Sequence, residues 1–361
     1  MKKEDDVKIL LLSRYDNLGA SSRYRSYQYL PHLRSCGFEI DVAPLLSNAY
    51  LQRLYSADRI PVADVVASYV RRKLLLLKKR SYDLIWIEYE AFPWVPAWME
   101  LILLSSRVPF VLDYDDAIFH RYDRHSSGLV RSFLGRKIDR VMSQATLVVA
   151  GNEYLASRAR EAGARRVEIL PTVIDLEKYP LNGANRSEMF TIGWIGTPKT
   201  VHYLNEIREA LQVVCKERTA RLVTIGATGF SLPDVPGENK PWSDATEVQE
   251  IQKFDVGVMP LVDGPWERGK CGHKLIQYMG CGKPVVASPV GVNSSIVDEG
   301  KTGLLASTTE EWVKALNALK QDEGLRLEMG RKGRAKVESR YSLQVTAPLM
   351  AALLNEAGGS R

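Results

Sequence analysis

Short apolar runs of strand type alternate with helical stretches along this chain, and this alternation limits its fold more than any other feature. In the first half the runs occupy residues 7–13, 38–44, 83–88, 109–115, 146–150 and 167–171. Runs that are apolar throughout are typical of strands buried on both faces of a sheet. The pattern therefore predicts a doubly wound parallel sheet flanked by helices.

The same pattern starts again after a polar stretch, residues 181–189, which we interpret as a linker. The second series of runs occupies residues 190–196, 221–226, 254–260, 284–288 and 303–307. A chain of 361 residues is long enough for two domains, each with its own core. We therefore predict an α/β protein with Rossmann-like domains at residues 1–180 and 190–340, facing each other across a cleft.

The composition excludes several classes of protein. Hydrophobic residues make up 45% and charged residues 25% of the chain, as in soluble globular proteins, and no run of about 18 apolar residues is present to span a bilayer. The N-terminal residues MKKEDD do not have the pattern of a secretory signal. The four cysteines form no CxxC pair, which favours free thiols in a reducing compartment. These features predict a cytoplasmic protein.

A basic amphipathic segment occupies residues 62–80 and includes the run RRKLLLLKKR. Apolar residues recur in it at helical spacing: Val62, Val65, Val66, Tyr69, Val70, Leu74 and Leu77. Such a helix suits peripheral contact with the anionic inner face of a membrane, and it equally suits packing on a core with a solvated basic face. Both interpretations stay open. Nucleic acid is not a predicted partner, because no binding motif accompanies the charge.

Residues 266–291 carry the clearest candidate for a ligand site, with the sequence WERGKCGHKLIQYMGCGKPVVASPVG. Lys270 and Lys274 are four residues apart and Gln277 follows three residues later, so a helix would present all three on one face. The helix is expected to end near Gly280, because Pro284 begins a buried strand. Ammonium groups at a helix start favour a phosphorylated ligand such as a pyrophosphate. A surface helix with solvated lysines is the simpler alternative.

This segment resembles the C-terminal signature of glycosyltransferase family 4, whose members are retaining enzymes of the GT-B fold. The residues QYMGCGKPVVAS match the second half of that signature. The common form of the signature has two glutamates separated by seven residues, and here Gly269 and Gln277 occupy their positions, with Glu267 nearby. The resemblance is therefore to a branch that lacks the standard pair. It implies a final helix, within residues 341–361, that crosses back to the first domain.

The first domain contributes candidate residues at the ends of its strands. Gly19, in the loop NLGASSR, matches a glycine-rich loop that approaches the donor phosphates in the resembled family, and Arg23 would grip an anionic acceptor. Asp115 aligns with the position that touches the donor sugar in many members. Glu88 and Glu90 would lie on one side of an extended strand, where they would orient acceptor hydroxyls or act as a general base. Solvated loop carboxylates are the alternative for this pair.

The residues Asp113, Tyr114 and Asp115 also spell the DxD motif with which metal-dependent transferases bind a nucleotide diphosphate. We predict no metal site, because the lysines near residue 270 already supply the positive charge that a cation would bring. Purely structural roles, as helix N-caps, would explain at least one of the aspartates.

The second domain supplies the other predicted donor contacts. After the run at 190–196, Gly196, Thr197 and Pro198 would open a helix whose amides receive a donor phosphate. Arg268 and Gln277 complete the predicted donor site, Gln277 as a ligand of the ribose.

Together, the pattern and the resemblance predict a retaining, metal-independent hexosyltransferase. It would move a sugar from a nucleotide diphosphate donor to a glycan or lipid-linked acceptor, in the synthesis of a cell-surface polysaccharide and without any further cofactor. Lys270, Lys274 and Asp115 are the predicted catalytic residues. A sugar-nucleotide epimerase, a phosphorylase and a catalytically weak nucleotide-sugar-binding subunit remain alternatives, the last because both standard glutamates are absent.

Overall fold

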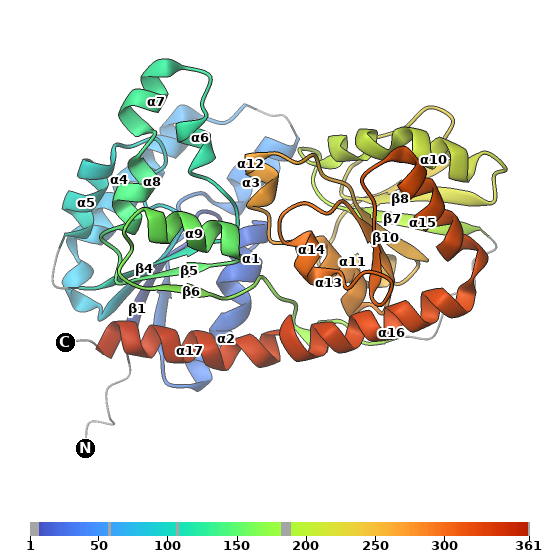
Figure 1. Ribbon diagram of the computed structural model, residues 1–361. Helices are drawn as coiled ribbons and strands as arrows, with labels where there is room; N and C mark the ends of the chain where they lie inside the picture. The colour runs from blue at the N-terminus through green and yellow to red at the C-terminus, as the bar shows by residue number, and fades with distance from the viewer. Residues whose placement is uncertain (1–6, 57–58, 106–107, 182–188, 360–361) are drawn as a thin grey trace. The chain divides into compact units, whose positions relative to one another are not determined.

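The computed structural model describes residues 7–56, 59–105, 108–181 and 189–359. The chain forms two compact units (Figure 1). Unit 1 consists of Met1–Thr172 and Thr346–Arg361, and unit 2 consists of Val173–Val345. The division falls at Thr172, ahead of the polar stretch 181–189, most of which lies outside the described residues.

Unit 1 is built on a six-stranded parallel sheet with the strand order β2-β1-β3-β4-β5-β6. Its strands are β1 (Lys8–Leu12), β2 (Glu39–Val42), β3 (Leu84–Glu88), β4 (Phe110–Tyr114), β5 (Leu147–Ala150) and β6 (Val167–Ile169). Each strand lies within a run predicted from the sequence. The residues of β3 and β4 are all buried, as expected for strands covered on both faces.

Helices connect these strands. They are α1 (Ala20–Arg25), α2 (Leu30–Ser35), α3 (Asn48–Tyr55), α4 (Val62–Leu77), α5 (Ala97–Leu104), α6 (His120–Asp123), α7 (Gly128–Leu134), α8 (Lys137–Met142) and α9 (Glu153–Glu161). The last helix, α17 (Leu343–Gly359), packs on the same unit: the hydroxyls of Thr346 and Tyr29 are 3.0 Å apart. Near its end, Gly358 lies close to Val7, because a Cβ added there would be 2.9 Å from Val7 Cγ1.

Helix α4 has apolar residues on two faces, which differs from the single apolar face predicted. Its inward side consists of Val65, Tyr69, Arg72 and Leu76, which are buried or partly buried. The other five apolar residues named in the sequence analysis point outward and are each at least 50% exposed: Val62, Val66, Val70, Leu74 and Leu77. The seven apolar residues cover about half of the helix circumference. Only part of that surface can be buried against neighbouring elements.

Unit 2 contains a second six-stranded parallel sheet, in the order β12-β11-β10-β7-β8-β9. Its strands are β7 (Phe190–Ile195), β8 (Ala220–Ile225), β9 (Gly237–Lys240), β10 (Val256–Met259), β11 (Val285–Ala287) and β12 (Gly303–Leu305). Counted from β7, this is the doubly wound order 3-2-1-4-5-6, which places a ligand crevice outside the carboxyl ends of β7 and β10. Both sheets confirm the predicted α/β doubly wound class.

The helices of unit 2 are α10 (Arg208–Cys215), α11 (Glu247–Ile251), α12 (Pro265–Arg268), α13 (His273–Gly280), α14 (Asn293–Ile296), α15 (Thr309–Gln321) and α16 (Glu323–Arg340). Apolar cores lie on both faces of the sheet, since Ile192 and Trp194 of β7 belong to one cluster and Ile195 to the other. Among the described residues, no helix of either unit has the length and apolar character needed to cross a bilayer.

Candidate active site

The donor residues predicted in the second half of the chain lie in or after the loops that follow β7 and β10 of unit 2. Residues 196–200 follow β7 and lead to a 3₁₀ helix, η4 (Val201–Ile207), rather than to the α-helix predicted there. The loop after β10 contains α12 and leads to α13. Both loops therefore open at the switch point of the sheet, where parallel α/β folds bind ligands.

Lys274, in the first turn of α13, extends over the end of β7. Its Nζ lies 5.0 Å from the centre of the Trp194 ring. A Cβ added to Gly196 would lie 3.0 Å from Lys274 Cε and 2.4 Å from Trp194 Cη2. The missing side chain at Gly196 thus leaves the space that the Lys274 stem and the indole occupy. The structure brings together two residues, Gly196 and Lys274, that the sequence analysis selected separately.

Lys270 is not part of α13, so the prediction that Lys270 and Lys274 share one helix face is wrong. The helix begins at His273, after Gly272, whose φ of 64° interrupts the helical geometry. Lys270 lies in the turn before it, and its Nζ is 6.0 Å from the centre of the Tyr203 ring. The Tyr203 hydroxyl donates a hydrogen bond of 2.5 Å to Glu267 Oε1. The two lysines therefore reach this edge of unit 2 from different backbone segments.

Gln277 is buried beneath this edge, in a polar network. Its Nε2 donates to the hydroxyl of Tyr179 at 3.0 Å and to Glu247 Oε1 at 3.2 Å. Glu247 Oε2 accepts a bond of 2.6 Å from Trp242 Nε1. Gln277 is 4% exposed, and its amide group donates to acceptors of the protein itself. We therefore replace the predicted ribose contact of Gln277 with a structural role, that of joining α13 to Glu247.

We expect Gln277→Glu to lower the free energy of unfolding by about 3 kcal/mol. The substitution removes two donated hydrogen bonds and places a second buried carboxylate beside Glu247. Glu247→Gln in the same chain should restore most of the stability, because the two residues then exchange donor and acceptor. Urea unfolding of the wild type, both single variants and the double variant measures the coupling. Additive effects of the two substitutions would contradict the network.

The remaining predicted donor residues of unit 2 are near the surface. The side chain of Arg268 donates to Asp263 from Nε at 2.6 Å and from Nη2 at 2.8 Å. The backbone N–H of Thr197 donates to Thr200 Oγ1 at 3.3 Å, and Pro198 is exposed. A phosphate at this loop would therefore compete with Thr200 for the Thr197 amide.

In unit 1 the switch point lies between β1 and β3, and the loops that follow these strands meet there. Gly19 precedes α1, and a Cβ added to it would lie 2.5 Å from Tyr15 Cβ. Tyr89, directly after β3, has φ of 63°. Its hydroxyl lies 2.9 Å from Ser21 Oγ and donates to the partly exposed carboxylate of Asp115. Tyr89, which sequence reasoning missed, thus connects the Gly19 loop to Asp115.

Glu88 anchors the loop after β1. It is buried inside unit 1, whereas we predicted that it would orient an acceptor or act as a general base. Its Oε2 accepts from the backbone N–H of Arg14 at 2.9 Å and from the Ser22 hydroxyl at 2.6 Å. Glu88 is 2% exposed, and burial raises the pKa of its carboxyl to about 7, although both hydrogen bonds oppose this rise. Because the left-handed Tyr89 turns the chain, Glu88 and Glu90 do not continue one extended strand.

The raised pKa of Glu88 predicts that stability falls as the pH rises from about 4.5 to about 7. In this window the folded carboxyl holds a proton that the unfolded one releases, so the stabilisation is complete below the unfolded pKa and is lost through the folded pKa. The decrease is about 3 kcal/mol for a shift of this size. Glu88→Gln keeps the accepting oxygen and should lessen the fall of the unfolding free energy between pH 5 and pH 7, whereas exposed Glu209→Gln should leave it unchanged. Equal slopes in wild type and Glu88→Gln would refute the raised pKa.

Glu90 is the centre of a buried ionic cluster and is a poor candidate for an acceptor ligand. Its Oε2 lies 2.6 Å from Lys137 Nζ and its Oε1 lies 3.4 Å from Arg14 Nη1. The hydroxyl of Tyr122 contacts both carboxylate oxygens, and Lys137 also lies 3.1 Å from Glu100 Oε2. We therefore replace the predicted acceptor role of Glu90 with a structural role, because both of its carboxylate oxygens already have partners within unit 1.

Arginines and aspartates of the first unit divide into buried and partly exposed members. Arg25 is 1% exposed, and its Nε donates to Asp113 Oδ1 at 2.7 Å, so Asp113 of the DxD motif is used inside the unit. Arg23 is partly exposed, and its guanidinium lies 4.7 Å from the centre of the Tyr24 ring. Arg23 and Asp115 therefore remain the members of this set that a substrate could reach.

Part of the chain matches a known protein family. Residues 189–322 match the family described as glycosyl transferases group 1. The matched segment includes Gly196, Lys270 and Lys274. No curated protein matches the chain.

Solved structures resemble nearly the whole chain. Sucrose-phosphate synthase from Thermosynechococcus elongatus superposes with a TM-score of 0.73 at 16% identity, covering 98% of this chain and 100% of that chain. Anabaena HepE in complex with UDP-glucose gives 0.72 at 16% identity, with 97% and 99% covered. A glycosyltransferase from Rickettsia africae gives 0.70 at 11% identity, with 99% and 100% covered. The fold is therefore GT-B, and together with the family match it supports a glycosyltransferase.

Proposed function

We propose that this protein is a retaining glycosyltransferase of the family 4 type, which transfers a sugar from a nucleotide diphosphate donor to a glycan or lipid-linked acceptor. The observation that carries this proposal is the convergence of Lys274, Gly196 and Trp194 at the switch point of unit 2. Gly196 lets the Lys274 stem and the indole pack against the end of β7. An ammonium group held in this way at a helix start suits a diphosphate.

In this reaction Lys274 and Lys270 neutralise the leaving diphosphate, whose negative charge grows in the transition state. The first amides of α13 and the Gly196 loop, with Thr197 and Pro198, contribute dipoles to the same charge. The aromatic rings beside the two ammonium groups restrict their positions without neutralising them. The scheme requires no metal ion and no further cofactor.

Unit 1 supplies the other substrate contacts in this proposal. Asp115 holds the transferred sugar, and the Tyr89 hydroxyl orients its carboxylate. Gly19 allows the loop after β1 to approach the donor, and Arg23 binds an anionic acceptor. Glu88 acts on these residues indirectly, because it fixes the loop through the Arg14 amide and Ser22.

The proposed setting is the cytoplasm, in the synthesis of a cell-surface polysaccharide. The four cysteines are free thiols, and three of them are buried: Cys215, Cys271 and Cys281. Burial raises the pKa of the Cys215 thiol to about 11 and that of the Cys281 thiol to about 12. Such thiols resist oxidation and suit a reducing compartment.

The test is a donor screen followed by product analysis. Thermal shift with UDP, GDP, ADP and dTDP sugars identifies the base and sugar that stabilise the protein. Mass spectrometry and NMR of the reaction with candidate acceptors then identify the product. A transferred sugar that keeps its anomeric configuration, formed equally well in EDTA, supports the proposal. A free altered sugar nucleotide would indicate the epimerase, and activity that requires added manganese would reject the metal-independent scheme.

A second candidate is a nucleotide-sugar-binding subunit with little turnover. The positions of the two standard glutamates hold Gly269 and Gln277, and Gln277 is engaged by Glu247 and Tyr179. In the donor screen this candidate predicts stabilisation by a nucleotide sugar with no product and no hydrolysis.

A further inference from the structure

Helices α4 and α5 of unit 1 each expose large apolar side chains. On α4 these are Val62, Val66, Val70, Leu74 and Leu77, which recur at intervals of three or four residues and are each at least 50% exposed. Helix α5 packs against α4 (Figure 1) and exposes Trp98 and Ile102, at 60% and 63%. These seven residues are called the apolar stripe below. Large apolar side chains that are exposed together on neighbouring helices are typical of an interaction site.

Cationic side chains lie within and beside the apolar stripe. Arg71, Lys73, Lys78 and Arg80 are exposed on or directly after α4. Asp64 is the only acidic residue in the sequence from 62 to 81. Its carboxylate lies 3.1 Å from Arg53 Nη1. The local charge is therefore strongly positive, and it complements an anionic partner.

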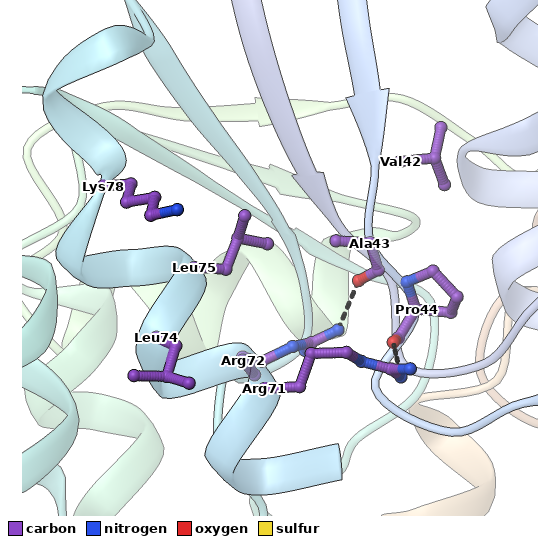
Figure 2. A pocket seen from close by; sticks show the side chains of 8 residues that line it. All are labelled: Val42, Ala43, Pro44, Arg71, Arg72, Leu74, Leu75 and Lys78. Carbon is purple, nitrogen blue, oxygen red and sulfur yellow. Dashed lines mark hydrogen bonds between the residues drawn. The ribbon is translucent and has the colours of Figure 1, made fainter. Parts of the chain in front are cut away.

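A pocket of about 420 Å³ opens beside the stripe, between α4 and the residues at the end of β2. Figure 2 shows Arg71, Arg72 and Lys78 on one side of it and Val42 and Pro44 on the other. Its remaining lining is Ala43, Leu74 and Leu75. Leu74 belongs both to the pocket and to the apolar stripe, so the two features are continuous.

Arg72 lines this pocket, and backbone carbonyl groups hold its guanidinium in place. It is 3% exposed, and its Nη2 donates to the carbonyl oxygens of Ser13 and Ala43, both at 2.6 Å. The carboxyl groups of Glu88 and Glu100 also act on this guanidinium. The accessible positive charge of the pocket therefore comes from Arg71 and Lys78, which are exposed. The neighbouring Arg71 makes one long bond, of 3.3 Å, to the carbonyl oxygen of Pro44. A phosphate could replace this contact with a charge-assisted one.

We propose that the apolar stripe and this pocket form a docking surface for an anionic phospholipid membrane. Valine, leucine and tryptophan side chains of α4 and α5 enter the interface between headgroups and acyl chains, where such residues are stable. A lipid phosphate occupies the pocket beside Arg71, Lys78 and Arg72. The lysines and arginines around the stripe attract the surface from a distance set by the ionic strength. This inference goes beyond the proposed function and does not depend on it.

The experiment is co-sedimentation of the full chain with vesicles, at low and high salt and without any donor or acceptor. We expect binding to vesicles that contain phosphatidylglycerol, none to pure phosphatidylcholine vesicles, and weakening by salt. Arg71→Gln with Lys78→Gln should weaken binding about tenfold or more and reduce its salt dependence. The triple substitution Val66→Ser, Val70→Ser and Leu74→Ser should weaken vesicle binding by the same factor at low and at high salt.

Matched controls in unit 2 distinguish this surface from general charge or stickiness. Lys301→Gln with Lys314→Gln removes two exposed cations, and Val213→Ser with Leu327→Ser removes two exposed apolar side chains. Both control variants should bind as the wild type does, and all variants should keep its melting temperature. Failure of the wild type to bind anionic vesicles overturns the proposal. So does equal loss in the controls, or a dimer in solution that the triple serine variant converts to a monomer.

Discussion

Replacing Lys274 with alanine is expected to lower kcat at saturating donor by about a hundredfold or more. The Lys274 ammonium lies at the end of β7, where the proposed leaving diphosphate gains charge in the transition state. Loss of such a charge partner costs ~3 kcal/mol or more. Steady-state kinetics with the donor found by the screen gives kcat, and calorimetry gives the donor affinity separately.

Lys274→Met is the matched variant for this prediction. It keeps an aliphatic stem in the space above Gly196 and removes the charge, so it should be as inactive as the alanine variant while melting like the wild type. Lys270→Ala should also lose most of its activity, whereas Lys314→Ala, an exposed lysine of α15, should not. Normal turnover in Lys274→Met at saturating donor would remove Lys274 from the reaction.

Lys137→Met is expected to lower the free energy of unfolding by about 4 kcal/mol. The Lys137 ammonium has no exposed surface and lies 2.6 Å from Glu90 Oε2 and 3.1 Å from Glu100 Oε2. It also donates a hydrogen bond of 2.5 Å to the carbonyl oxygen of Phe92. Removing one partner of a buried ionic cluster leaves charges without compensation, and this costs more than the intact cluster contributes. Urea denaturation at pH 7 measures the loss.

Further substitutions separate the charge effect from the loss of packing. Adding Glu90→Gln and Glu100→Gln to Lys137→Met neutralises the cluster, and this triple variant should be more stable than Lys137→Met alone. Lys301→Met, at an exposed position, should change stability by less than about 0.5 kcal/mol. A loss below about 1 kcal/mol in Lys137→Met would contradict the buried cluster.

The fold could be predicted from local patterns because each central strand is a short apolar run between helices. Strands β3 and β4 are buried over their full length, and such runs are stable only inside a sheet covered on both faces. Strand β9 could not be predicted in this way. Its sequence, GENK, contains no apolar residue, and it pairs with β8 alone at the edge of the sheet. Its backbone hydrogen bonds, rather than its side chains, make it a strand.

The candidate site was predictable where one residue type has a strong physical preference. A glycine after β7 and lysines near a helix start were visible in the sequence, and the structure places Gly196 against Lys274. The direction of each side chain was not visible. The turn at Gly272 separates Lys270 from the helix, and the left-handed Tyr89 changes the course of the chain after β3. Backbone geometry at single residues is set by the packing around them.

The sequence by itself determined the α/β class, the two sheets and the position of the basic segment, because hydrophobic periodicity and net charge are properties of neighbouring residues. Only the tertiary structure decided which polar groups face inward. Glu90 contacts Lys137, which is 47 residues away in the sequence, and Gln277 contacts Glu247, which is 30 residues away. Neither pair is therefore visible in a local sequence pattern. The same holds for α4, whose outward apolar side is defined by what fails to pack against it. Burial depends on the whole fold, and burial decides whether a carboxylate, an amide or a valine serves the core or a partner.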